Sequence, residues 1–283
     1  MILVFGKTGQ VALELGRYSN VLALDRKEAD FTNVNECIGA IKKYTPAAVI
    51  NAAAYTDVDH AEFNYEYANQ VNGHTPGEIA KICAEMRIPF LHISTDYVFD
   101  GSGMKPWEEN ATPSPLNAYG KSKALGEALV KSSGAIYVIL RTSWTFSLTG
   151  KNFLTTMQRL SEVNDELKIV NDQIGGPTPA KELASACYKI IKQLLEKPEK
   201  SGIYHYSGTP NISRAEFAEK IFKELKVGTF VTPVASSQYS LPAMRPLNSR
   251  LNCTKTKEVF GLNRPNWYPH LKYLTHLAFQ RLN

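Results

Sequence analysis

The amino-acid sequence predicts an α/β fold in which a Rossmann-like, doubly wound parallel sheet is followed by a smaller C-terminal lobe. Three observations predict it. In the first half, short β-branched apolar runs alternate with segments of helical periodicity, which is typical of βαβ units. These apolar runs are nearly unbroken, as in strands that helices cover on both faces. After Trp144 the chain changes to longer irregular stretches rich in Pro, Gly and Asn.

The expected elements follow one another in chain order. Strands are predicted at "ILVFG", "VLALD", "AAVINAAA", "PFLHIST" and "AIYVILRTSW". Helices are predicted at "QVALELGRY", "NVNECIGAIKKY", "EYANQVNGHTPGEIAKICAEM" and "NAYGKSKALGEALVKSS". The stretches "VNDQIGGPTP" and "LPAMRPLNSRLN" belong to the second lobe. We therefore expect one domain over residues 1–146 and a smaller lobe over residues 147–283, with a segment at about 180–206 returning to the main sheet.

Composition excludes several classes of protein. With 283 residues and 43% hydrophobic content, the chain can build a sizeable core. A net charge of +5, with its basic residues scattered among acids, predicts no nucleic-acid partner. The sequence shows no signal peptide and no long apolar span, so neither secretion nor a membrane is expected. Four widely spaced cysteines predict reduced thiols in the cytoplasm.

The glycine-rich start, "VFGKTGQVALELG", predicts a dinucleotide site. Gly6 ends the first strand, Gly9 follows three residues later, and Ala12 lies in the first helix. Such a turn lets the backbone approach a pyrophosphate at a helix N-terminus. Asp25 ends the second strand, where a carboxylate can accept from the adenosine ribose hydroxyls, and the adjacent Arg26 could hold a 2′-phosphate, so NAD and NADP both stay open.

A possible proton-transfer pair lies in "SPLNAYGKSKALGE". Tyr119 and Lys123 are four residues apart, which places both on one face of the predicted helix, whereas Lys121 should point elsewhere. A nearby ammonium stabilises a phenolate, so we expect Lys123 to lower the pKa of Tyr119. Thr95 follows a neighbouring strand at the same carboxyl edge of the sheet, where its hydroxyl could hold a substrate oxygen.

These motifs together resemble the extended short-chain dehydrogenase/reductase superfamily, whose catalytic Tyr and Lys have the same spacing. More narrowly, the chain resembles the dTDP-4-dehydrorhamnose reductase family. The segments that carry this resemblance run in order from Phe5 to Asn252: "FGKTGQV", "NAAAYTDVDHAE", "STDYVFDG", "SPLNAYGKSKALGE", "LRTSWTF", "NDQIGGPT" and "RPLNSRLN". It implies an NAD(P)-binding domain over residues 1–146 and a substrate-binding lobe after it.

The resemblance also implies roles for single residues. Tyr119 matches the proton donor, Lys123 the residue that holds the nicotinamide ribose, and Thr95 the residue that tunes the tyrosine. The cofactor is expected at the Gly6 turn and at Gly9, Gln10, Val11, Asp25, Arg26, Asp30, Phe31, Ala54, Tyr55 and Thr56. The deoxysugar nucleotide is expected at Val58, Thr95, Asp96, Tyr97 and Trp144.

The implied reaction is reduction, by NADPH or NADH, of the C4 keto group of a nucleotide-linked 4-keto-6-deoxyhexose. A sister nucleotide-sugar reductase or epimerase and a non-catalytic regulatory relative are the alternatives. Some family members form homodimers around a divalent cation held by glutamates. Glu14 and Glu182 fall near the matching places, so the resemblance allows a homodimer with a non-catalytic Mg²⁺, and it implies no metal in the catalytic step.

Overall fold

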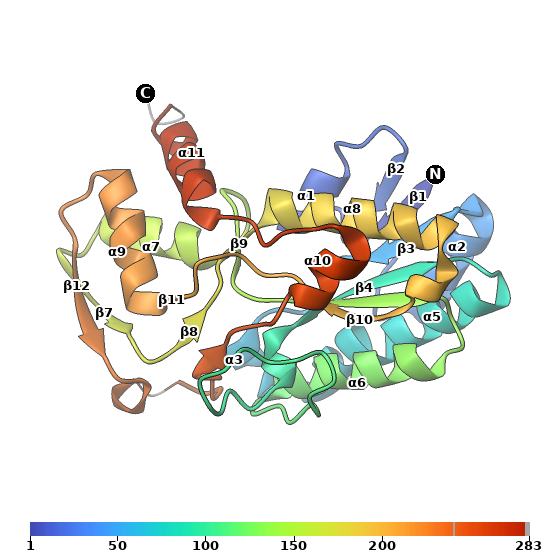
Figure 1. Cartoon of the computed structure of the whole chain (residues 1–283), viewed down its shortest axis with the longest axis horizontal. Coiled ribbons are helices and arrows are strands. Elements are labelled where there is room, and N and C mark those ends of the chain that lie inside the picture. The colour runs from blue at the N-terminus through green and yellow to red at the C-terminus, as the bar shows by residue number, and fades with distance from the viewer. Residues whose placement is uncertain (240, 281–283) are drawn as a thin grey trace.

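A central parallel sheet organises the larger part of the molecule (Figure 1). The computed structural model describes residues 1–239 and 241–280. Six strands pair in the order β10-β5-β4-β3-β1-β2, and every pairing is parallel. Their bounds are β1 Ile2–Phe5, β2 Val21–Leu24, β3 Ala48–Asn51, β4 Phe90–Thr95, β5 Tyr137–Thr142 and β10 Gly202–His205. The predicted α/β fold is confirmed.

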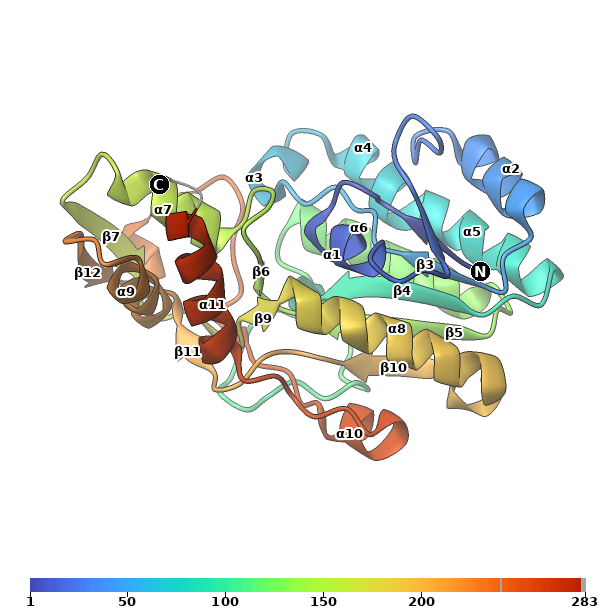
Figure 2. The same ribbon diagram turned by 90° about the horizontal axis from the view of Figure 1, so that it is seen from above.

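Helices cover both faces of this sheet (Figure 2), which is why its strands are mostly apolar. One face packs against α1 (Gln10–Leu15) and α8 (Ala180–Glu196). The other packs against α2 (Val34–Tyr44), α5 (Thr75–Glu85) and α6 (Ala118–Ser132). Asn117 caps α6 by accepting from the Gly120 N–H at 2.7 Å.

The predicted helix between Glu66 and Met86 is present but not uniform. It consists of α4 (Tyr65–Asn69), a π-helical turn η1 (Gln70–His74) and then α5. Two further short pieces complete this part of the chain: α3 (Val58–Ala61) and a 3₁₀ turn η2 (Asp96–Val98) directly after β4.

The smaller lobe lies beyond one end of the sheet (Figures 1 and 2). Three helices, α7 (Phe153–Ser161), α9 (Arg214–Leu225) and α11 (Trp267–Gln280), enclose its apolar core around Phe217 and Trp267. Its strands form small sheets: β6 (Thr145–Phe146) with β9 (Thr178–Pro179), β7 (Glu166–Val170) with β12 (Phe230–Val234), and β8 (Ile174–Gly175) with β11 (Ile212–Ser213) and β13 (Asn248–Ser249). The remaining elements are η3 (Pro198–Lys200), η4 (Ser236–Gln238) and α10 (Thr254–Phe260).

The strand order reverses between β1 and β3. Ligands of open α/β sheets bind in the crevice outside the carboxyl ends of the strands at such a point. Phe5 and Asn51 are register partners at those ends, so the turns that follow β1 and β3 face each other.

The structure can be compared with two expectations from the sequence, one about the cysteines and one about membrane-spanning helices. Cys37, Cys83, Cys187 and Cys253 are all buried and unpaired, which confirms four free thiols. Within residues 1–239 and 241–280, no helix has the length and apolar character needed to cross a membrane.

Candidate active site

A groove of about 380 Å³ opens at the strand-order reversal. Gly6 lies at its base with φ of +102°, and a Cβ on this residue would come within 2.8 Å of the Ala53 nitrogen, so only glycine fits. Eight of the residues expected to hold a cofactor line the groove: Gly6, Gly9, Asp25, Arg26, Asp30, Phe31, Ala54 and Tyr55.

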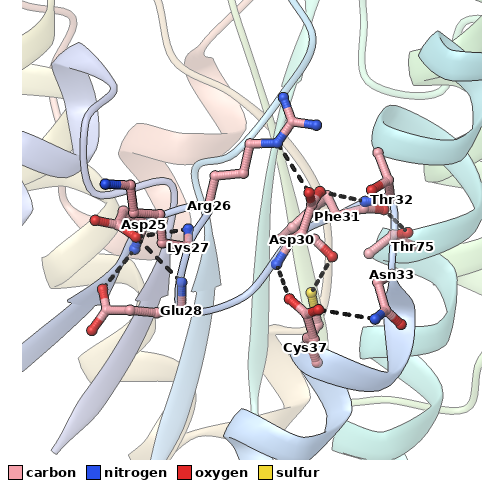
Figure 3. A network of polar contacts seen from close by, with 11 residues as sticks. Asp25, Arg26, Lys27, Glu28, Asp30, Phe31, Thr32, Asn33, Cys37 and Thr75 are labelled. Atoms are coloured by element: carbon pink, nitrogen blue, oxygen red, sulfur yellow. Dashed lines mark hydrogen bonds and ion pairs between the residues drawn. The ribbon is translucent and has the colours of Figure 1, made fainter.

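Three of the residues that line the groove, Asp25, Arg26 and Asp30, belong to a network of polar contacts (Figure 3). Asp25 Oδ1 accepts from the Lys27 N–H at 2.8 Å, and Arg26 Nε donates to Asp30 Oδ2 at 3.1 Å. The Thr32 N–H, which donates to Asp30 at 2.8 Å, is the main cause that lowers the pKa of that carboxyl group. These contacts orient carboxylates that can accept from the hydroxyls of a ligand.

The other expected cofactor residues lie beside the groove. Gln10 donates to the Thr145 carbonyl at 3.3 Å and accepts from Ser147 Oγ at 3.0 Å, so it links α1 to the chain that follows β5. Val11 is buried in the core under α1, and Thr56 is exposed. The Tyr55 backbone is held on both sides by the buried Asn72 amide, at 2.8 and 2.9 Å.

Tyr119 and Thr95 meet at the carboxyl edge of β4. Thr95 Oγ1 donates to Asp96 Oδ1 at 3.0 Å. Burial raises the pKa of Tyr119, while the Thr95 hydroxyl beside it opposes that rise. The phenol is therefore protonated at neutral pH and can act as a donor. Its ring packs edge-to-face on Tyr97, with centroids 5.6 Å apart.

Lys123 shares the helix face with Tyr119, and its exposed fraction is only 2%. Lys121, by contrast, is exposed, as its spacing predicts. Burial lowers the pKa of Lys123 to about 8. Its Nζ donates to the Ile93 carbonyl at 2.7 Å and lies 3.2 Å from His92 Nε2.

One expectation is therefore wrong for this arrangement: Lys123 does not lower the pKa of Tyr119. That pKa is raised, and the groups that act on it are Thr95, Asp96 and Tyr97. The reason is geometric, because the Lys123 amine is turned onto β4, toward His92 and Ile93.

The residues expected to face a sugar nucleotide lie around two arginines of the smaller lobe. The Tyr97 phenol interacts electrostatically with the guanidinium groups of both Arg214 and Arg245. Trp144, in the left-handed region with φ of +49°, has the Arg214 guanidinium 3.7 Å above its ring centroid. Burial raises the pKa of Asp96 to about 6.

Val58 is the first residue of α3 and is half-buried, and the next residue, Asp59, anchors α3 to the smaller lobe. Asp59 Oδ2 accepts from Arg245 Nη2 at 2.7 Å, and Asp59 Oδ1 accepts from the Ala243 N–H at 3.2 Å. Beside this anchor lies a second cavity of about 510 Å³, whose lining includes Leu116, Gln173, Ser236, Tyr239, Met244 and Arg245. Segments from both halves of the chain thus form its wall.

Sequence reasoning missed Arg214 and Arg245 as site residues. Arg245 lies in the quoted segment "RPLNSRLN", but nothing in its spacing links it to Tyr97. Arg214 stands at the start of α9, and only the fold brings it to Trp144.

The glutamates considered for a divalent cation already have basic partners. Glu14 pairs with Arg17 at 3.2 Å, and Glu182 lies 3.4 Å from His270. Among the described residues, no group of three or more metal-binding side chains is assembled.

The chain is similar to known proteins over nearly its whole length. The family model described as the RmlD substrate binding domain matches residues 1–278. The dTDP-4-dehydrorhamnose reductase of Salmonella typhimurium is 41% identical and covers 94% of each chain, and that of Escherichia coli is 37% identical over 98% of each. A crystal structure of the Clostridium acetobutylicum dTDP-4-dehydrorhamnose reductase superposes with a TM-score of 0.91 at 33% identity, covering 98% of this chain and 99% of that one. The Bacillus anthracis reductase, solved in complex with NADP, gives 0.88 at 32% identity, covering 96% and 97%.

Proposed function

Because the chain belongs to the RmlD substrate binding domain family, we propose that it is a dTDP-4-dehydrorhamnose reductase. It is an NAD(P)H-dependent oxidoreductase that reduces the C4 keto group of dTDP-4-dehydro-L-rhamnose to dTDP-L-rhamnose, a precursor of cell-surface polysaccharides such as the O antigen of lipopolysaccharide. The observation that carries the proposal is the Tyr119 phenol beside Thr95 at the carboxyl edge of β4, where burial raises the pKa of Tyr119 and so favours its protonated form. Relatives of that name cover nearly the whole chain.

The protein's own residues manage the proton and the substrate oxygen. The nicotinamide, when bound, supplies the hydride. Tyr119 gives its proton to the oxygen at C4, and Thr95 donates a hydrogen bond to the same oxygen as negative charge develops there. Lys123, once its ammonium reaches the phenol and the nicotinamide ribose, favours the phenolate that Tyr119 leaves behind.

The cofactor groove supports binding of either NADPH or NADH. We assign the diphosphate to the turn at Gly6, Gly9, Gln10 and Val11, the adenosine to Asp25, Arg26, Asp30 and Phe31, and the rest of the groove wall to Ala54, Tyr55 and Thr56. Arg26 is the candidate for a 2′-phosphate, because its guanidinium lies at the groove and carries a charge at any physiological pH.

The sugar nucleotide is assigned to Val58, Thr95, Asp96, Tyr97 and Trp144. Arg214 and Arg245, which flank Tyr97, provide positive charge suited to its diphosphate. We assign the domain boundary to residue 146, so that the sugar nucleotide lies between the cofactor domain and the smaller lobe.

The proposal also covers the oligomeric state, the partners and the location of the protein. A homodimer with a non-catalytic Mg²⁺ at Glu14 and Glu182 would require both glutamates to leave their present partners, so no step of the reaction is assigned to a cation. Neither a nucleic acid nor a membrane is a proposed partner. A cytoplasmic location is favoured by the four free thiols.

The test is an assay with purified protein, NADPH and dTDP-4-dehydro-L-rhamnose, followed by loss of the reduced nicotinamide signal. Multiple turnovers that consume one NADPH per sugar support the proposal. Activity that needs no added cofactor, with NAD retained through purification, favours an epimerase. Binding of the sugar nucleotide without any turnover favours a regulatory relative.

A further inference from the structure

A buried chain of polar side chains runs behind the catalytic lysine. Asn51 Oδ1 accepts from the Ala53 N–H at 3.0 Å, and Asn51 Nδ2 lies 3.0 Å from His92 Nδ1. His92 Nε2 lies 3.2 Å from Lys123 Nζ, which donates to the Ile93 carbonyl at 2.7 Å. Asn51 and His92 are fully buried, so no solvent competes for these contacts.

The donors and acceptors of this chain determine the tautomer of His92. The Ala53 N–H is a backbone donor and must face the Asn51 oxygen, so the Asn51 amide nitrogen faces the imidazole and donates to Nδ1. Burial and the nearby Lys123 lower the pKa of His92 well below its usual value, so the ring is neutral. A neutral imidazole that accepts at Nδ1 carries its proton on Nε2.

That Nε2–H points at Lys123. An ammonium has three donors and no acceptor, so it would oppose the imidazole N–H at 3.2 Å. A neutral amine has one lone pair and two N–H groups. It can accept from His92 and donate to the Ile93 carbonyl, which satisfies each polar group of the chain.

The charged and titratable groups around Lys123 do not reverse the preference of this position for a neutral amine. Glu127, one turn along α6, favours the ammonium. Both of its oxygens, however, are already bound: Arg141 donates at 2.7 and 2.9 Å and Ser94 at 2.6 Å. Tyr119, on the same face of α6, is protonated, and Asp96, on η2, hydrogen-bonds Thr95.

We infer that the contacts of Lys123 in this position are those of the neutral amine, which accepts a hydrogen bond from His92, whose tautomer Asn51 dictates, and that the amine takes up a proton when it leaves this position. The proton comes from water and forms an N–H bond on Nζ, and no electrons are transferred. His92 and Asn51 are thus positioning residues that favour the uncharged form of the catalytic lysine until the cofactor is bound. This last role rests on the proposed function, whereas the resting state itself does not.

The test is NMR of the cofactor-free protein, with lysine labelled at ¹³Cε and the Lys123 signal assigned by its loss in Lys123→Arg. We expect Lys123 to titrate near 8, against about 10.4 for exposed lysines. Asn51→Asp presents an acceptor to Nδ1, moves the imidazole proton there and turns a lone pair toward Lys123. The pKa of Lys123 should therefore rise by roughly one unit or more in this variant.

The matched control is His205→Gln, which removes another fully buried histidine, 3.3 Å from Arg141 instead of Lys123. It should leave the Lys123 titration unchanged. The ¹⁵N shifts of His92 in the wild-type protein should show the proton on Nε2, and this measurement decides the matter if Asn51→Asp does not fold.

Three results overturn the inference: Lys123 titrating with the surface lysines, a His92 proton on Nδ1, or a folded Asn51→Asp variant with no shift. All three measurements are made without substrate or cofactor. The result for Lys123 is therefore independent of whether the protein has reductase activity.

Discussion

At the scale of single residues, Tyr119 and Lys123 differ in the protonation state that their surroundings favour. Tyr119 is half-buried beside Thr95 and keeps its proton, which suits a donor, while burial favours the uncharged form of Lys123. Spacing alone placed both on one helix face and Lys121 on another. It could not show that the Lys123 amine is turned onto His92, because that histidine is hidden within the apolar strand "PFLHIST".

Replacing Tyr119 by Phe removes the proton donor and little else. We expect kcat to fall by about 10²- to 10⁴-fold, with the Kd for NADPH nearly unchanged. Steady-state assays and fluorescence titration measure the two quantities. Lys121→Ala is the control and should keep full activity, because its side chain is exposed on another face of α6; a loss comparable to that of Lys123→Ala would contradict the assigned helix face.

The affinity for NADPH should depend on pH through Lys123. Its pKa is about 8 in the free protein and is expected to be higher once the ammonium contacts the cofactor ribose. Binding then takes up a proton in the window above pH 8, so affinity is full below that pH and falls by up to about tenfold per pH unit above it. Calorimetry in buffers of different ionisation enthalpy measures this proton uptake. A Kd for NADPH that stays constant from about pH 7 to 9.5 would contradict the prediction.

At the scale of elements, close packing of α6 on the π-helical turn η1 positions the catalytic face. A Cβ on Gly126 would come within 2.2 Å of the Asn72 carbonyl oxygen. The alternation of apolar runs predicted the strands and helices of the sheet domain, because each pattern is local. The π-helical turn at Gln70–His74 was missed, since its residues read as ordinary helix and only the packing against α6 distinguishes it.

Gly126→Ala should therefore destabilise the protein by about 1–3 kcal/mol, because backbone must move to admit a methyl group. Gly39→Ala is the matched control. It lies in α2 and is exposed, and an added Cβ would meet nothing within 4 Å beyond the nearby backbone of its own helix. This variant should be more stable by about 0.5–1 kcal/mol, the usual gain for alanine within a helix. Urea unfolding of both variants measures these changes, and equal effects would refute the packing argument.

At the scale of the whole molecule, the site is complete only where the two halves of the chain meet. Tyr97 follows β4 of the sheet domain, while Arg214 and Arg245 come from distant parts of the smaller lobe. No spacing in the sequence connects these three residues, so the candidate catalytic residues could be predicted and the arginines around them could not. The Asp59 carboxylate ties the two halves together by binding both Arg245 and the Ala243 N–H.

Asp59→Asn should weaken the contact between Asp59 and Arg245 without changing the cofactor groove. The variant loses the ion pair, so we expect KM for the sugar nucleotide to rise by about tenfold, the effect of roughly 1.4 kcal/mol, while the Kd for NADPH stays as in the wild type. Glu78→Gln, which breaks an exposed pair with Lys81, is the control and should change neither value. An unchanged KM for Asp59→Asn would show that the contact is dispensable.

The central claim is that this protein delivers hydride to C4 of a nucleotide-linked 4-keto sugar while Tyr119 supplies the proton. The most direct measurement uses NADPH deuterated at the transferred position, with dTDP-4-dehydro-L-rhamnose as acceptor and NMR of the isolated product. We expect one deuterium at C4 of dTDP-L-rhamnose, formed by the wild-type protein and lost with Tyr119→Phe. Unreacted sugar in the presence of folded wild-type protein, or a product without deuterium at C4, would contradict it.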